Sequence, residues 1–191
     1  MMASSSHKAR RQSRPGQPAD SHLIDSLISD LTSHHAQKAR RRLVRIGRPA
    51  VPALVRALAE PNAQLRWEAA KALSQIADPN TADALVIALE DDSFGVRWLA
   101  AEGLIRIGPQ AVELVLKALI EHPKSTLLRE GAHHVFHDLE NDQLREITAP
   151  VLEAMLGVEP SVEVPQAAAQ ALSRLAPGGG IPKQAEQSAE M

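Results

Sequence analysis

The 191-residue chain is long enough to bury one sizeable core, contains no cysteine and has a net charge of -2 at neutral pH. The absence of cysteine excludes disulfides, thiolate metal sites and a cysteine nucleophile. Two tryptophans and two phenylalanines are the only rings apart from histidine. The core must therefore be aliphatic, and the abundant alanine and leucine favour helices over strands. We expect an all-α protein.

Residues 1–20 are rich in Ser, Arg, Pro and Gln and are predicted to form a disordered basic tail. No signal-peptide stretch follows the first charges, and no apolar run approaches the ~20 residues that cross a bilayer. Residues 1–56 carry eleven lysines and arginines against three aspartates, a net of +8, while the remainder carries ten against twenty, a net of -10. We expect a cytoplasmic protein without a membrane partner, basic at one end and acidic at the other.

Residues 21–175 contain an internal repeat. The phrase at residues 65–77 aligns with the phrase at residues 96–108, thirty-one residues later, through a tryptophan, an Ala-Ala pair and a leucine followed by an isoleucine. Weaker copies occur around Leu43, Leu128 and Val164. Shorter amphipathic phrases supply the first helix of each pair, and prolines mark the breaks between helices. These first helices are predicted at residues 23–31, 51–59, 82–89, 111–120 and 147–156.

The pattern therefore predicts ten helices in five pairs across residues 21–175. Residues 176–191 begin with a glycine-rich stretch and continue with polar residues, so they are predicted to form a second disordered tail.

The repeated phrase is an aliphatic residue, Arg, two further residues, Ala-Ala, and then Leu with Ile three residues later. It resembles the bacterial HEAT-like repeats first associated with phycobilisome lyases. The resemblance covers roughly residues 21–175 and implies a right-handed α-solenoid whose second helices line the concave side. That family includes scaffolds, lyase subunits and iron oxygenases on one architecture, so function must be argued from the site.

Helical spacing separates a buried side from an open side in the third pair. Val96, Ala100, Gly103, Leu104 and Ile107 recur on one face and are predicted to be buried. Trp98 lies about 200° from Val96 at 100° per residue, and Trp67 occupies the equivalent position. The resemblance then implies that both rings face the groove, about 8–10 Å apart. They either form a binding platform or cover neighbouring helices, and we favour the platform.

The predicted groove continues with charged and histidine side chains. The same two helices add Glu68, Lys71, Glu102 and Arg106, and the fourth pair adds Glu130, His133, His134 and His137. His133 and His137 at i, i+4 could share a divalent metal with Glu130, but the spacing lacks the Glu beside a ligating His that is usual in catalytic sites. We predict a polar lining without metal, cofactor or catalytic residue.

Three arginines recur at one position of the repeat, Arg66, Arg97 and Arg129. In the family this arginine generally joins neighbouring repeats through acidic residues of the loops, such as Asp91 or Asp92. We therefore assign the three arginines a structural role.

Other functions have weaker support. The HEAT-like enzyme deoxyhypusine hydroxylase holds two irons on His-Glu pairs, and the equivalent positions here contain none. A phycobilin lyase subunit would stack the tryptophans on a tetrapyrrole, with Lys71 or Arg106 at its propionates. Nucleic acid could follow Lys38, Arg41 and Arg45, which share a helix face. The sequence favours a non-catalytic scaffold that binds a protein or peptide on its concave surface.

Overall fold

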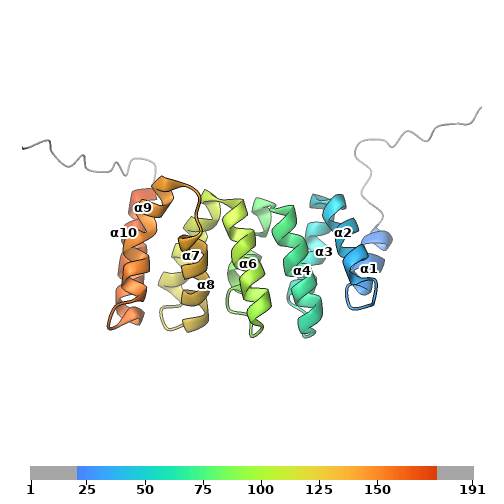
Figure 1. Cartoon of the computed structure of the whole chain (residues 1–191), viewed down its shortest axis with the longest axis horizontal. Coiled ribbons are helices and arrows are strands. Elements are labelled where there is room, and N and C mark those ends of the chain that lie inside the picture. Colours follow the sequence, from blue (N-terminus) through green and yellow to red (C-terminus); the bar gives the residue numbers. More distant parts are fainter. Residues whose placement is uncertain (1–20, 176–191) are drawn as a thin grey trace, which may run out of the picture.

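The computed structural model describes residues 21–175, so the two predicted tails lie outside the described residues. Within this range the chain forms ten α-helices and no strand, which confirms the all-α prediction. Figure 1 shows the helices side by side in a row. They are α1 (Ser21–Asp30), α2 (Ala36–Ile46), α3 (Val51–Leu58), α4 (Ala63–Ile76), α5 (Ala82–Ala88), α6 (Phe94–Ile107), α7 (Pro109–Glu121), α8 (Thr126–His137), α9 (Asp142–Met155) and α10 (Pro160–Leu175).

Local signals in the sequence place the helix ends. Asn62, Ser125 and Asn141 each accept a hydrogen bond from a backbone N–H in the first turn of α4, α8 and α9. Gly47 and Gly108 end α2 and α6 at positive φ, which glycine adopts without strain. Ala77 occupies the same position after α4 with φ 50°, the only non-glycine residue at positive φ among the described residues.

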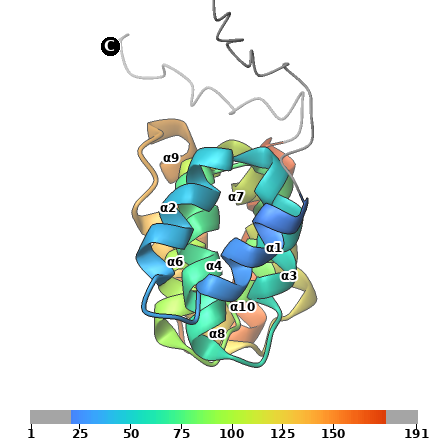
Figure 2. The ribbon, with the colours of Figure 1, turned by 90° about the vertical axis from the view of Figure 1, so that its right-hand side faces the viewer.

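The helices form two layers, seen end-on in Figure 2. In the first four pairs the odd-numbered helices lie in one layer and the even-numbered helices in the other. The even-numbered helices pack against one another more extensively than the odd-numbered ones. This difference is expected between the inner and outer layers of a curved solenoid, and it agrees with the implied concave position of the second helices.

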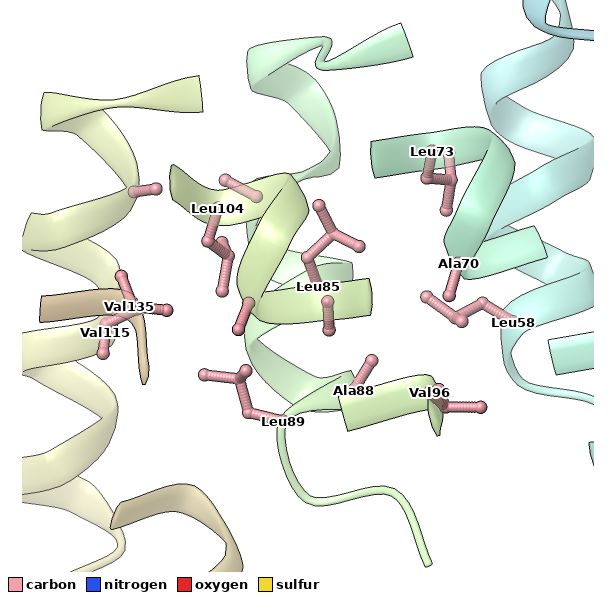
Figure 3. Packing of buried hydrophobic residues seen from close by; sticks show 14 of the residues in the cluster. Leu58, Ala70, Leu73, Leu85, Ala88, Leu89, Val96, Leu104, Val115 and Val135 are labelled. Atoms are coloured by element: carbon pink, nitrogen blue, oxygen red, sulfur yellow. The ribbon is translucent and has the colours of Figure 1, made fainter. Parts of the chain in front are cut away.

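The core lies between the two layers and is almost wholly aliphatic. Figure 3 shows buried side chains of first helices, such as Leu85 and Val115, alternating with those of second helices, such as Leu104 and Val135. The predicted stripe of α6 is buried at Val96, Ala100, Gly103 and Leu104, while Ile107 at the helix end is partly exposed. Gly103 allows a close approach, since a Cβ there would lie 2.8 Å from Leu85 Cδ1.

The last pair departs from the frame that the sequence pattern predicts. Helix α10 packs extensively against α7, which puts it in the outer layer, while α9 packs beside α8 in the inner layer. The two helices have therefore exchanged layers. The apolar spacing of a helix identifies which of its faces is buried, but it does not identify the layer that the helix joins.

Candidate functional site

An exposed aromatic cluster lies on the inner layer, where α6 meets α8. Phe94 is 67% exposed and Trp98 is 48% exposed, and their ring centroids are 6.0 Å apart. His134 of α8 packs against Trp98 with its ring centroid at 4.0 Å. We call Phe94, Trp98 and His134 the Trp98 surface. Phe94 opens α6 directly after the Asp91-Asp92-Ser93 loop, and sequence reasoning passed over it because its position is not part of the repeated phrase.

His134 is the polar part of this surface. Its side chain is 13% exposed, and its Nε2 has no hydrogen-bond partner in the structure. Carboxylate oxygens of Asp138 and Glu102 lie 3.3 Å and 3.5 Å from that nitrogen. An Nε2–H on this imidazole would have two carboxylates within reach.

Asp138 is also in contact with His137. Its Oδ1 lies 2.7 Å from His137 Nδ1. This hydrogen bond lowers the pKa of Asp138, burial opposes the shift, and the charges of the neighbouring histidines add to it. Asp138 therefore remains a carboxylate beside His134 at neutral pH.

The other residues of the predicted histidine turn lie at the protein surface. His133 and His137 are exposed and stack with ring centroids 5.8 Å apart. Glu130 is exposed and its carboxylate lies 3.7 Å from Arg97. Within residues 21–175 no three His, Asp or Glu side chains are grouped so that they could hold a metal ion.

Trp67 has a different environment from Trp98. Its ring is partly buried against α6, where a Cβ added to Gly95 would lie 2.9 Å from Trp67 Cδ1. Lys71 Nζ lies 4.4 Å from the ring centroid, and the Arg40 guanidinium lies 5.9 Å from it. Trp67 thus covers the α4–α6 junction, and the ring contacts of Trp98 are with Phe94 and His134 instead of with Trp67.

Glu68 lies in the interior and not on the groove lining. It is 4% exposed and forms an ion pair with Arg40 of α2, which is also buried. Two buried charges are tolerated only when they neutralise each other. This ion pair therefore links the first and second helix pairs, and Glu68 has no free charge to offer a ligand. Lys71 covers Trp67, while Arg106 is 4.0 Å from Glu102 and donates to the Ser74 carbonyl.

The repeated arginines share one local contact and differ in their longer ones. In each case Nη1 donates to a carbonyl six residues earlier, in the loop that leads into the helix: Glu60 for Arg66, Asp91 for Arg97 and Pro123 for Arg129. Only Arg66 and Arg97 also reach an acidic side chain of the following pair. Arg129 instead donates to Thr126 of its own helix.

Arg66 makes a shorter contact than Arg97: its Nε lies 2.7 Å from Asp91 Oδ2, and Nη2 adds a second contact to Asp92. Burial would raise the pKa of Asp91, but the hydrogen bonds from Arg66 and the Ser93 N–H outweigh burial and lower it. The same pairing raises the pKa of Arg66. The arrangement joins the second and third helix pairs through their side chains.

The basic residues singled out for nucleic acid lie on one exposed face of α2. Lys38, Arg41 and Arg45, together with Gln37 and Arg42, line a hollow of about 330 Å³. Arg40 is excluded from this face by its buried ion pair with Glu68. Arg48, just beyond α2, forms an ion pair with Asp78.

The two-layered array and its exposed side chains define a helical repeat protein with a surface suited to binding. The family model for HEAT repeats matches residues 21–104 and 82–173, and the chain belongs to the HEAT-repeat family. Proteins built of such repeats are generally scaffolds for other proteins. The match does not distinguish the phycobilisome-lyase type of repeat, and no curated relative matches the chain.

None of the helices in the described range 21–175 is long and apolar enough to cross a membrane.

Proposed function

We propose that this protein is a non-catalytic interaction module that binds a partner protein on its inner layer, centred on the Trp98 surface. The observation that carries the proposal is the exposure of Phe94 and Trp98 in one cluster. Large exposed rings are costly in water, and buried aromatic anchors supply much of the affinity at protein interfaces. The proposal includes a cytoplasmic location, since a cysteine-free chain has no disulfide to keep oxidised.

Charged groups around the cluster would orient the partner. The Arg97 guanidinium lies 5.6 Å from the Phe94 ring centroid, Glu130 lies 3.7 Å from Arg97, and Glu102 lies 3.5 Å from His134, so both signs of charge adjoin the cluster. Such rim charges contribute to specificity and association rate more than to affinity.

The test is photo-crosslinking from position 94. A photoreactive phenylalanine analogue in place of Phe94 should crosslink one major partner, and a tagged Phe94→Ala/Trp98→Ala double variant without the analogue should no longer co-purify with that partner. The matched control is Leu156→Ala, because Leu156 is 83% exposed in the last pair and away from α6. Undiminished capture of the same partner by the double variant, while it keeps the parent's circular dichroism and melting temperature, contradicts the proposal.

The catalytic alternatives have their own measurements. A phycobilin lyase subunit would bind a linear tetrapyrrole and change its absorption, and the change would disappear in Trp98→Ala. A metal enzyme would hold stoichiometric metal that is lost in a His133→Ala/His137→Ala variant. Either result would replace the scaffold proposal by an enzymatic one.

Nucleic-acid binding is a second candidate because four basic side chains gather on one face of α2. It predicts an affinity for single- or double-stranded DNA or RNA that falls steeply with salt and is lost in Lys38→Glu/Arg41→Glu/Arg45→Glu. An affinity unchanged by this charge reversal contradicts it.

A further inference from the structure

A second open surface runs along the outer layer. Between α3 and α5 the structure forms a hollow of about 720 Å³, and a smaller hollow of about 280 Å³ follows between α5 and α7. Ile87 of α5 lines both, and we call the two together the Ile87 groove. Its apolar lining includes Val55 and Leu58 of α3, Ala84 and Ile87 of α5, and Leu114 of α7.

The fold leaves this groove open because the odd-numbered helices stand apart. Helix α5 has only seven residues and makes few contacts with α3, whereas α4 and α6 behind them pack closely. Leu85 and Leu89 of the same segment are buried, but Ile87 is 74% exposed. Because covering an exposed isoleucine is favourable in water, the groove offers a partner a substantial apolar contact.

The rim of the groove is acidic. Around the larger hollow, Glu60, Glu90, Asp91 and Asp92 stand against the single cation Arg66, which is engaged by both aspartates. The smaller hollow adds further carboxylates, Asp83 and Glu121. Its lysine, Lys117, is held by Glu113 with a contact of 2.6 Å. The exposed carboxylates thus outnumber the cations free to balance them.

We propose that the Ile87 groove is a docking site for a basic segment of a partner protein. An aliphatic side chain of that segment enters between α3 and α5 against Ile87, and flanking lysines or arginines meet Glu60, Glu90 and Asp92. Charge complementarity and the apolar floor together select this occupant, because an acidic or uncharged segment would leave the carboxylates unpaired. The groove shares no lining residue with the Trp98 surface, so it can take a partner of its own.

The test uses a fluorescein-labelled peptide with a central pair of leucines between two runs of arginine, and anisotropy titrations with the full chain. The proposal predicts saturable binding that weakens as salt is raised. Ile87→Ser should weaken binding about tenfold, the equivalent of ~1.4 kcal/mol of lost apolar contact. Glu60→Lys/Glu90→Lys should weaken it at least as much at low salt, and less at high salt.

Matched controls separate the groove from general stickiness. Leu156→Ser removes an equally exposed aliphatic side chain from the last pair and should leave the affinity unchanged. Phe94→Ala/Trp98→Ala should also leave it unchanged, so a failure of the inner-layer proposal and a failure of this one are distinguishable. Peptides with serine in place of leucine, or glutamate in place of arginine, should bind at least tenfold more weakly.

Two results would overturn the proposal. One is equal affinity of Ile87→Ser and the parent, which would leave only non-specific attraction between charges. The other is a large gain in peptide affinity on replacing Arg10, Arg11 and Arg14 by serine, which would assign the groove to the chain's own basic segment instead of a partner.

Discussion

The second and third helix pairs carry tryptophan at the same position, yet the two rings have opposite environments. Trp67 of α4 lies against Gly95 and beneath Lys71, whereas Trp98 of α6 stays half exposed. The position equivalent to Gly95, two residues before the repeated arginine, is Leu127 on α8. Only the glycine leaves room for an indole to lie flat on the next helix. A repeat position therefore sets the direction of a side chain, and the next helix decides whether it is covered.

The largest expected difference is in the cost of removing each ring. Trp67→Ala should lower the free energy of unfolding by about 3 kcal/mol, because it empties the α4–α6 junction. Trp98→Ala should lower it by less than about 1 kcal/mol, because much of that ring is in water. Urea unfolding followed by circular dichroism measures both. Equal losses in the two variants would show that the rings are equally structural.

Filling the space at Gly95 should abolish the difference between the two rings. Gly95→Leu makes this position of α6 like its equivalent on α8 and should cost about 2 kcal/mol through overpacking. In a Trp98→Phe background, the emission of Trp67 should shift to longer wavelength as the ring is displaced into water. An unchanged emission maximum would mean that Gly95 does not hold the ring in place.

The ion pair between the second and third pairs makes stability depend on pH. The pKa of Asp91 in the folded protein lies below its usual value. The stability that the ion pair contributes is therefore complete above the pKa of about 3.9 that Asp91 has in the unfolded chain, and it is lost as pH falls through the folded-state pKa. Asp91→Asn should cost about 1.5 kcal/mol at neutral pH. The difference in the free energy of unfolding between Asp91→Asn and the parent should shrink below about pH 4.

The control for this ion pair is Asp92→Asn, which removes an exposed contact to the same arginine and should cost less. If the free energies of unfolding of Asp91→Asn and the parent differ by the same amount down to pH 2, the ion pair is not the source of the pH dependence.

The smallest expected effect concerns the ends of α4 and α6. Ala77→Gly should raise the free energy of unfolding by about 1 kcal/mol, because Ala77 is in the left-handed conformation (φ 50°, ψ 41°), which glycine adopts without strain. Gly108→Ala should lower it by at least as much. Thermal melting of both variants gives the comparison, and a fall in the melting temperature of Ala77→Gly would contradict it.

Most of the fold could be predicted from the sequence because each helix pair is a local unit. The apolar spacing around Val96 and the prolines between helices identified the helices and their buried faces. The exchange of α9 and α10 could not be predicted, because it depends on how the last pair packs against α7 and α8.

The candidate site was predictable only in part, because it also depends on packing between helix pairs. The repeat identified the inner layer and Trp98, but the burial of Glu68 depends on Arg40, twenty-eight residues away in another pair. The Ile87 groove depends on the spacing between α3 and α5, which no local pattern encodes. Local periodicity specifies faces, and contacts between pairs specify which parts of a face remain accessible.

The exchanged layers of the last pair also bear on self-association. A repeat array can lengthen, within a chain or end to end between molecules, when its final pair offers the same interface that each earlier pair offered to the next. With α10 beside α7 and α9 beside α8, the end of this array presents the two helices in reversed order. An incoming first pair, α1 and α2, would meet the wrong partner in each layer. End-to-end growth through this pair would therefore need an interface different from the one that joins the earlier pairs.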